Sequence, residues 1–497
     1  MSRIVNKQGN IYLYQQVIDL IKDMQSQGTL GAGEKLPSLR AMAQKLSISI
    51  PTVQQAYQEL ERQGVISARE KSGFYLNAGS DQCHQPRRIQ LARQPVAVNK
   101  QALIEQVFDS LHRAAVVPLG IANPVAVNPT DKVLSRTMRR VMNVAGHKAI
   151  NYGPLDGFAA LKKQIINRYL DFAIGVNSDE LIITNGAQEA LHIAVQCVTQ
   201  AGDIVAIESP CYFGIIEMLE SLGLKVIEIP MCPQQGVCVE DLQQAFAEHD
   251  IKACIFSTSI SNPLGSKMPE ERRRRLVHLV EDQGAVLIED DVYGELAYEP
   301  DGAKPAQYYS TKGKVITCSS LSKTAAPSYR VGWMIAGKFA PQARRLKRAM
   351  SCASSLMNQW TLYEFMNSGD YDKNLRVMRQ RLALNKERMR ALVQRHFPPG
   401  TRMTNPQGGC VLWLQLPSQY DVVALFHLAL EAGISITPGA IFSATDKYRQ
   451  CLRLSFGVQW SEEIEKAVAR LGALCLQVQK GKAKVTPMGT PMGMPKA

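Results

Sequence analysis

The sequence predicts two folded parts: a small N-terminal helix-turn-helix unit with a β-hairpin wing, and a larger α/β domain built on a mainly parallel sheet. Three observations support this organisation. Residues 11–64 carry apolar side chains at helical spacing in three segments, and two short strand-like runs follow. From about Pro118 onward, apolar strands alternate with amphipathic helices, which is typical of a parallel sheet covered on both faces. A polar stretch without periodicity, residues 79–99, indicates a linker between the two parts.

The composition is that of a globular protein with several domains: 497 residues, 45% hydrophobic and 20% charged. No apolar run is long enough for a transmembrane helix and the N-terminus lacks a signal-peptide core, so we expect a cytoplasmic protein without a membrane partner. The 11 cysteines are scattered singly, which predicts reduced thiols and no metal site. The net charge of +13 permits nucleic-acid binding without establishing it.

Three helices are expected in the N-terminal unit. The first covers residues 11–28, and the second opens at residues 37–40 with Ser38 as its N-cap. The third begins at about Pro51, where a missing N–H is harmless, and ends near Gly64. Its outer face carries small polar side chains, namely Thr52, Gln54, Gln55 and Gln58. Two helices joined by a tight turn, the second with such a face, are typical of a DNA-binding helix-turn-helix.

A wing follows these helices. Residues 65–69 and 74–76 are expected to form two strands, with a basic hairpin tip at Lys71 between them. Residues 1–79 hold nine Lys/Arg and six Asp/Glu, an excess of only 9 − 6 = +3, so the order of the elements is a stronger signal than charge. A small helical interaction domain that does not bind DNA is the alternative interpretation.

The N-terminal unit resembles the winged helix of the GntR family of bacterial repressors over residues 11–77. The resemblance is carried by Leu36-Pro37-Ser38-Leu39-Arg40, Thr52-Val53, Ala56-Tyr57, Leu60-Glu61, Gly64 and Ser72-Gly73-Phe74. It implies that DNA is contacted by Arg40, Thr52, Gln54, Lys71 and Gly73. One position departs from the family: Ile50-Pro51 follows Ser49 where an arginine is usual, which predicts one phosphate contact fewer.

The larger domain is expected to begin with a helix over residues 99–115. Its strands are expected at residues 181–184, 204–207, 225–229, 253–256, 285–288 and 314–318. Ligands of such sheets bind at the carboxyl ends of the strands, so the residues after each strand are the candidates for a site. The run Arg272-Arg273-Arg274-Arg275 follows two acids at a helix start and is interpreted as a solvent-exposed face.

The last of these strands leads into Ser319-Ser320-Leu321-Ser322-Lys323-Thr324, and Arg330 follows seven residues after Lys323. A lysine amine can form a Schiff base with an aldehyde cofactor, while hydroxyl groups and a guanidinium hold its phosphate. Taken alone, Lys323 also fits an ordinary surface position in a serine-rich loop.

Other strand ends add groups that suit the same cofactor. Gly186-Ala187-Gln188 opens a helix whose free N–H groups suit a phosphate. Tyr212 can lie on a flat ring, and Asn262 can donate to a phenolate oxygen. Asp290 follows an apolar strand and needs a positive partner such as a protonated pyridine nitrogen, with Tyr293 three residues further on. The spacing to Tyr293 favours Asp290 over Asp291. Each residue alone also has an ordinary structural interpretation.

In this order, the strand ends resemble class I aminotransferases of fold type I over about residues 115–478. The resemblance implies a smaller C-terminal α/β subdomain, a homodimer and pyridoxal 5'-phosphate as cofactor. The residues it assigns to the cofactor are Lys323 for the Schiff base, Asp290 for the pyridine nitrogen, Asn262 and Tyr293 for the ring oxygen, Tyr212 for stacking, and Gly186, Ala187, Gln188, Ser320, Ser322 and Arg330 for the phosphate. Tyr152 resembles the tyrosine that reaches the neighbouring subunit's phosphate, and Arg453 the arginine that binds a substrate α-carboxylate.

The whole chain resembles the MocR/GabR group of regulators within the GntR family. Its expected parts are the winged helix (1–79), a linker with a leading helix (80–114), the aminotransferase-like domain (115–478) and a disordered basic tail (479–497). The first hypothesis is a transcription factor that binds operator DNA and senses an amino acid or amine by Schiff-base exchange at Lys323. The second is a working aminotransferase with an accessory winged helix, and the third is an interaction head on an inactive cofactor domain. The effector, the operator and the sign of regulation stay open.

Overall fold

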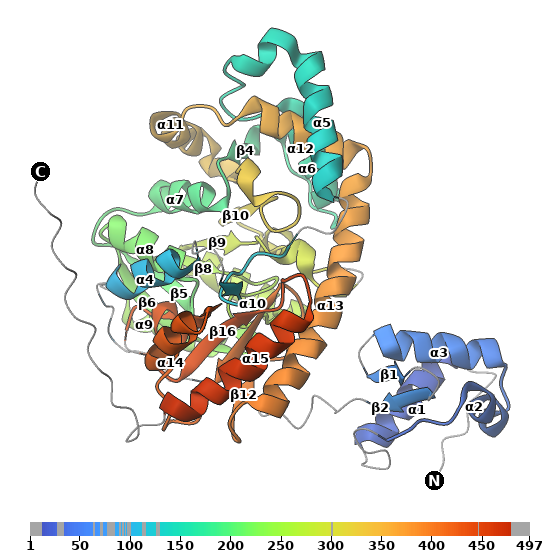
Figure 1. The fold of residues 1–497 in the computed structure, drawn as a ribbon. Coiled ribbons are helices and arrows are strands. Elements are labelled where there is room, and N and C mark those ends of the chain that lie inside the picture. Colours follow the sequence, from blue (N-terminus) through green and yellow to red (C-terminus); the bar gives the residue numbers. More distant parts are fainter. Residues whose placement is uncertain are drawn as a thin grey trace, which may run out of the picture.

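The computed structural model describes residues 12–26, 34–62, 65–69, 73–76, 85–88, 91, 94, 96, 101–111, 116–125, 130–299, 302–445 and 447–478. The N-terminal unit and the larger domain are separate folded bodies (Figure 1). The N-terminal unit has a hydrophobic core of its own, formed by residues between Val17 and Leu76. The predicted tail, residues 479–497, lies outside the described residues.

The N-terminal unit is a winged helix, as predicted. Its elements are α1 (Leu13–Ser26), α2 (Leu39–Leu46), α3 (Ile50–Arg62), β1 (Ile66–Arg69) and β2 (Gly73–Leu76). Ser38 caps α2 by accepting a hydrogen bond from the Ala41 N–H at 3.2 Å, and Ser47 ends the helix in the left-handed region with φ +53°. The hydroxyl of Tyr57 donates to the Pro37 carbonyl at 2.9 Å, which ties α3 to the start of α2.

An eight-stranded sheet forms the centre of the larger domain, in the order β4-β11-β10-β9-β8-β5-β6-β7. The strands are β4 (Leu181–Thr184), β5 (Ile204–Ser209), β6 (Lys225–Cys232), β7 (Gly236–Val237), β8 (Ile251–Phe256), β9 (Val286–Asp290), β10 (Val315–Ser320) and β11 (Gly332–Ile335). Strands β6, β5, β8, β9 and β10 are parallel neighbours, whereas β11 runs antiparallel to both β10 and β4. The six predicted strands are confirmed, and β7 and β11 are additional.

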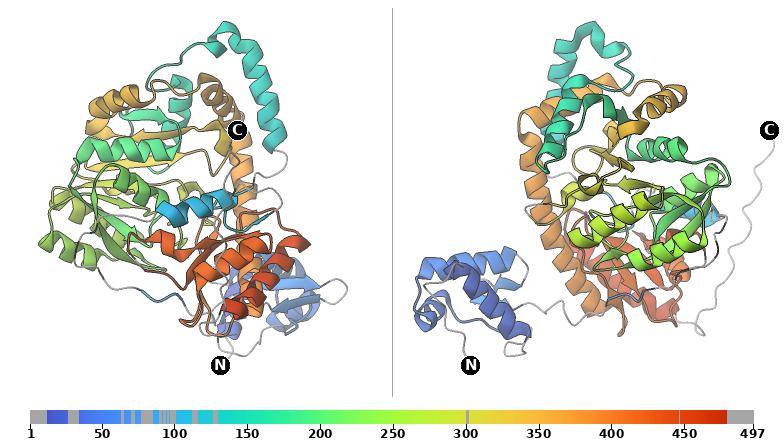
Figure 2. Two further views of the ribbon diagram at one scale, coloured as in Figure 1. Left: turned by 60° about the vertical axis from the view of Figure 1, so that its left-hand side comes forward. Right: turned by 180° about the vertical axis from the view of Figure 1, so that it is seen from behind.

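Helices cover both faces of this sheet (Figure 2). One face packs against α7 (Ala187–Val198), α8 (Phe213–Ser221) and α11 (Ala340–Met350), and the other against α6 (Ala159–Leu170), α9 (Val239–Glu248) and α10 (Glu270–Asp282). Alternate strand residues enter opposite cores: Ile182 and Ile288 on the first side, Ile183 and Leu287 on the second.

A second, smaller sheet lies in the C-terminal part and has the order β12-β13-β16-β15. It consists of β12 (Arg402–Met403), β13 (Val411–Gln415), β15 (Thr437–Pro438) and β16 (Cys451–Ser455), and a separate pair joins β3 (Val117–Pro118) to β14 (Ile434–Ser435). The remaining helices are α4 (Gln101–Leu111), α5 (Thr130–Ala145), α12 (Leu356–Asn367), α13 (Asp370–His396), α14 (Val422–Glu431) and α15 (Glu462–Cys475). The predicted C-terminal α/β subdomain is thus present.

The interpretation of the four consecutive arginines as a solvent-exposed face is wrong for Arg273. This side chain is 1% exposed, and its guanidinium donates to the carbonyls of Thr258, Met268 and Lys304. It therefore ties two loops to α10, the one before this helix and the one that contains Lys304, a contact that helical periodicity alone does not reveal.

Among the described helices, none combines the length and apolarity that a membrane crossing requires. The described cysteines are free thiols, and no metal-binding group of three His, Cys, Asp or Glu side chains occurs among the described residues.

Candidate functional site

A cavity of about 260 Å³ lies at the carboxyl ends of the parallel strands. It brings together most of the predicted cofactor residues from different elements. Those that line it are Ala187, Gln188, Tyr212, Asn262, Asp290, Tyr293, Ser320, Ser322, Lys323 and Arg330, together with the predicted carboxylate-binding Arg453. Parallel strands deliver these side chains to one edge because their carboxyl ends meet there.

Lys323 lies in the turn that follows β10. The turn is fixed at both ends, since the Leu321 N–H donates to the Val331 carbonyl and the Ala325 N–H donates to the Leu321 carbonyl. Burial lowers the pKa of the Lys323 amine, and the charges of Arg453 and Arg330 lower it further, against the opposing effect of Asp290. A lowered pKa increases the fraction of neutral, nucleophilic amine near neutral pH.

Asp290 is the last residue of β9 and shares the cavity with Lys323. Burial raises the pKa of its carboxyl to about 6, although it accepts a hydrogen bond from the Val292 N–H and lies near the charge of Lys323. Asp291 lines a different cavity, together with Arg168 and Glu295. The geometry therefore favours Asp290 as the partner of a positively charged ring nitrogen.

One end of the cavity carries the residues predicted to hold the phosphate and is called the phosphate end below. It is shaped by Gly186, the N-cap of α7, with φ +87°. A Cβ atom at this position would lie 2.3 Å from Nη2 of Arg330, so only glycine lets the guanidinium approach. Arg330 donates from that atom to the Asn185 carbonyl at 3.0 Å. The Ser322 hydroxyl is buried and has no hydrogen-bond partner among the described residues. A guanidinium, an unpaired hydroxyl and the N–H groups at the start of α7 fit a phosphate.

Gln188 lines the cavity, and its side chain is positioned by a contact outside the predicted phosphate site. Its side-chain amide donates to the Gly214 carbonyl at 2.8 Å. Ser320 accepts a hydrogen bond from the Ser322 N–H at 3.4 Å and so orders the turn before Lys323.

The groups predicted to hold the ring are already ordered by other contacts. The Tyr293 hydroxyl donates to the Ala122 carbonyl at 2.7 Å, and Asn262 Oδ1 accepts from Arg453 Nη1 at 3.0 Å. Tyr212 precedes α8, where a Cβ on Gly214 would lie 2.7 Å from the Tyr212 ring. The absence of a side chain at Gly214 therefore makes room for the Tyr212 ring.

Arg453 comes from β16 of the C-terminal subdomain and is 3% exposed. Besides Asn262, it donates to the Gly120 carbonyl at 2.9 Å and to the Thr437 hydroxyl at 3.3 Å. Burial lowers the pKa of this guanidinium, which favours a negatively charged ligand as its partner. The bond to Asn262 joins the two subdomains across the cavity.

Tyr152 does not line the cavity of its own chain. It is 88% exposed and follows α5 and the short helix Gly146–Ile150. This position leaves it available to another subunit, so its role at a neighbouring phosphate stays a prediction.

Two residues behind the phosphate end were not predicted. Glu189 accepts hydrogen bonds from the Asn185 backbone N–H at 2.6 Å and from its side-chain amide at 3.2 Å. Lys347, only 1% exposed, lies 3.9 Å from Glu189 and donates to the Cys352 carbonyl at 3.2 Å. Lys347, Glu189 and Asn185 therefore form a chain of contacts that ends at Arg330. An acid in the first turn of α7 was a usable signal for Glu189, whereas Lys347 lies in a helix rich in Arg and Lys and gave none.

The predicted DNA-binding residues lie on α2, α3 and the wing. Arg40 and Gln54 are exposed, and the Thr52 hydroxyl lies 2.7 Å from that of Ser49. Gly73 opens β2 with φ +104°, and Lys71 lies outside the described residues.

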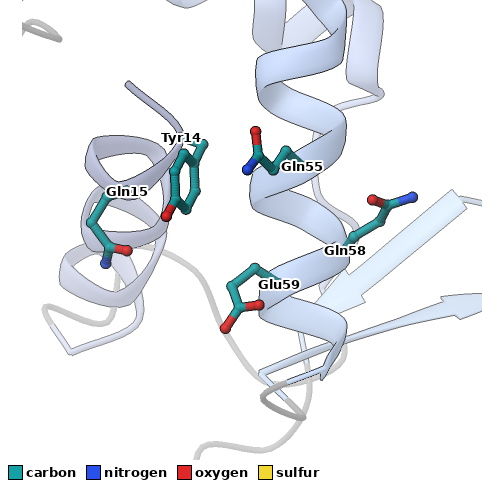
Figure 3. Close-up of a pocket in the computed structure, with 5 residues that line it drawn as sticks. All are labelled: Tyr14, Gln15, Gln55, Gln58 and Glu59. Atoms are coloured by element: carbon teal, nitrogen blue, oxygen red, sulfur yellow. The ribbon is translucent and has the colours of Figure 1, made fainter. Parts of the chain in front are cut away.

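A separate polar pocket of about 410 Å³ lies between α1 and α3, lined by Tyr14, Gln15, Gln55, Gln58 and Glu59 (Figure 3). Gln55 and Glu59 point toward α1 in this view. These two side chains therefore face the groove beside α1.

Comparisons with known proteins agree with both parts of the chain. Residues 116–471 match the family described as aminotransferase class I and II, and residues 13–76 match the bacterial regulatory proteins of the gntR family. The uncharacterized HTH-type transcriptional regulator YjiR of Escherichia coli (strain K12) is 35% identical over 92% of this chain and 98% of its own. A second one from this strain, YdcR, is 34% identical over 93% of this chain and 98% of its own.

Solved structures resemble the larger domain. LysN, the α-aminoadipate aminotransferase from Thermus thermophilus, superimposes with a TM-score of 0.69 at 24% identity, covering 76% of this chain and 95% of that protein. A multiple substrate aminotransferase from Thermococcus profundus gives a TM-score of 0.69 at 22% identity, with 76% and 96% covered. At these identities the likeness shows a shared fold.

The contacts behind the phosphate end predict a selective effect on cofactor binding. Glu189→Gln or Lys347→Met should weaken the binding of pyridoxal phosphate by about tenfold, because a charged contact of about 1.5 kcal/mol that orders Arg330 is lost. Binding of pyridoxal, which lacks the phosphate, should change little. Absorbance titrations with the two compounds measure this, with Arg348→Gln on the exposed side of α11 as the matched control. Equal losses for both compounds would contradict the assignment.

The raised pKa of Asp290 predicts a pH-dependent effect in the cofactor-free chain. The folded state, with a pKa of about 6, holds this proton more tightly than the unfolded state, with a value near 3.8. Stability therefore falls as pH rises from about 3.8 to 6 and stays lower above that range. Asp290→Asn should remove this loss, so that its advantage in the free energy of unfolding grows by roughly 2–3 kcal/mol between pH 4 and pH 8. Urea unfolding at both pH values tests this; an advantage independent of pH would be the contrary result.

Proposed function

Because the chain belongs to the aminotransferase class I and II family and carries a gntR-type winged helix in front of that domain, as MocR-type regulators do, we propose that it is a DNA-binding transcriptional regulator that senses an amino acid or amine at Lys323. The observation that supports this most directly is the combination of two sites in one chain. A helix-turn-helix with an exposed outer face precedes a cavity that holds Lys323, Asp290 and Arg453 together.

The residues of the cavity fit pyridoxal phosphate, the cofactor of this family. When bound, it supplies an aldehyde that forms a Schiff base with an amine, and a ring that withdraws electrons. Ser322, Arg330 and the start of α7 line the cavity where they would hold the phosphate, and Asp290 would pair with the ring nitrogen. Lys323 would supply the resident amine, which the amine of a ligand would replace. Arg453 would bind the carboxylate of an amino-acid ligand, and a bidentate contact suits its guanidinium.

The linker offers a route from this cavity to the winged helix. The Arg87 N–H donates to the Gln415 side chain at 2.8 Å, and Arg402 donates to the Gln85 carbonyl at 3.1 Å, both in the C-terminal subdomain. Arg88 pairs with Asp241 of α9, which belongs to the subdomain built on the eight-stranded sheet. The segment 85–88 therefore contacts both subdomains. A ligand carboxylate that draws Arg453 away from Asn262 would change the relative position of the two subdomains. The segment 85–88, which is bonded to both, would move with them.

A homodimer would bring two winged helices to one DNA site. Val144, Ile150 and Tyr152 are 72%, 87% and 88% exposed at the end of α5 and just after it. Figures 1 and 2 show α5 extending away from the body of the domain. Exposed apolar side chains on such a projection favour a contact with a second copy, and paired half-sites on the operator follow from two-fold symmetry.

A working aminotransferase is the second candidate, because the cavity retains Lys323, Asp290 and Arg453 in one place. Turnover with a keto-acid acceptor distinguishes the two candidates. Sustained multiple turnovers would favour the enzyme, while a single spectral change without turnover favours the sensor.

The proposal is tested by linking ligand binding to DNA binding in the full-length protein. Amino acids and amines are screened by the absorbance of the cofactor, and each responsive compound is added to a duplex from upstream of the protein's own coding sequence. We expect salt-sensitive DNA binding that the compound shifts, and no shift in Lys323→Ala. Absence of DNA binding at low salt would refute the regulator.

Arg453 predicts which ligands are recognised. Arg453→Lys should weaken the response to amino acids by roughly 10–100-fold, since a bidentate charged contact worth about 1.5–3 kcal/mol is lost. The response to amines without a carboxylate should persist. Arg470→Lys on the exposed side of α15 is the matched control. A parallel loss for both ligand classes would argue that Arg453 acts only by packing.

A further inference from the structure

The recognition helix α3 begins with an exposed aliphatic residue. Ile50 is its first residue and is 43% exposed. Over the described residues of the winged helix, 12–26, 34–62, 65–69 and 73–76, Tyr12 is the other large apolar side chain with comparable exposure. The hydrophobic core of this unit does not include Ile50. Packing within the winged helix therefore leaves this side chain available for a contact with another molecule.

The orientation of Ile50 is fixed by the rest of the helix. Val53, Ala56, Tyr57 and Leu60 are fully buried, which sets the outer face of α3. Ser49 accepts a hydrogen bond from the Thr52 N–H at 3.3 Å and so caps the start of the helix. These contacts hold the first turn in place.

Gln54 lies four residues after Ile50, so the two side chains are neighbours on one face of the helix. Gln54 is also exposed, and the Thr52 hydroxyl beside them is engaged with Ser49. The first two turns of α3 thus present one branched aliphatic group and one amide. Neither carries a charge for a phosphate, and both are suited to base edges.

Resting on the proposed regulator function, we propose that Ile50 and Gln54 select thymine and adenine on neighbouring base pairs of each operator half-site. The N-terminal residues of a recognition helix contact base edges in the major groove. There, an aliphatic side chain fits the C5-methyl group of thymine, and a glutamine amide pairs with N6 and N7 of adenine. The resemblance to the GntR family implies an arginine at this position, and an isoleucine there exchanges a charge contact for a methyl contact.

The test removes the methyl group from the DNA and its partner from the protein. A duplex is selected from a random pool with the full-length protein, and each thymine is then replaced singly by deoxyuridine, which lacks only the C5-methyl group. For the unmodified protein we expect at least one position per half-site where this weakens binding by about fourfold, equivalent to about 0.8 kcal/mol for one methyl-sized group. Ile50→Ala should bind both duplexes equally at that position.

Two further variants separate this effect from damage to the fold. Tyr12→Ala removes the other exposed apolar side chain and should keep the preference for thymine. Ile50→Arg should lose the preference and should make the slope of log affinity against log salt more negative by about 1, because one phosphate contact is gained. Circular dichroism confirms that each variant is folded.

The possible outcomes are distinct. Indifference of the unmodified protein to deoxyuridine at every position would overturn the role of Ile50, and so would a preference for thymine that survives in Ile50→Ala. Failure of the unmodified protein to select any duplex would instead remove the proposed regulator function on which this inference rests.

Discussion

The larger domain depends on holding an amine and a carboxylate partly out of water at the ends of two adjacent parallel strands. Strands β9 and β10 pair Asp290 with Cys318, five residues before Lys323. Burial shifts the pKa of Asp290 upward and that of Lys323 downward, so each group resists the charge that it would carry in water. A cofactor with an aldehyde for the amine and a ring nitrogen for the carboxylate would relieve both effects. The register of two strands thereby determines what the cavity can bind.

At the phosphate end, too, a few residues fix the geometry of the cavity. Gly186 is the residue that lets Arg330 approach the start of α7, and Glu189 and Lys347 hold the segment to which Arg330 is bonded. Lys347 also contacts the loop after α11, and Ser354 of that loop lies against Gly153, next to the exposed Tyr152. A continuous set of contacts therefore joins the phosphate end to the surface expected to meet a second subunit.

Much of this arrangement could be predicted from local sequence. Apolar strands followed by Ser322-Lys323, Asp290 or Asn262 have a short-range signature, because the strand and its functional end are adjacent in the chain. No such short-range signature predicts the positions of Lys347, Arg273 and β11. Their positions depend on contacts with residues distant in sequence, such as Lys347 with Glu189 and Arg273 with the Lys304 carbonyl. The exposure of Ile50 likewise required the packing of α3, since its sequence alone suggested only a missing phosphate contact.

The anchored linker also limits where the winged helix can be. Gln85 is held by Arg402, and Leu76 ends the wing, so nine residue steps separate the two bodies. A fully extended chain of that length spans only about 30 Å. Each winged helix is therefore confined to a small volume near the larger domain. In a dimer, the effective concentration of the second winged helix at a DNA site bound by the first is correspondingly high. The separation between two operator half-sites is then limited by twice this reach, the distance between the two anchors and the size of each winged helix, so a shift of the anchors changes which spacings can be bridged.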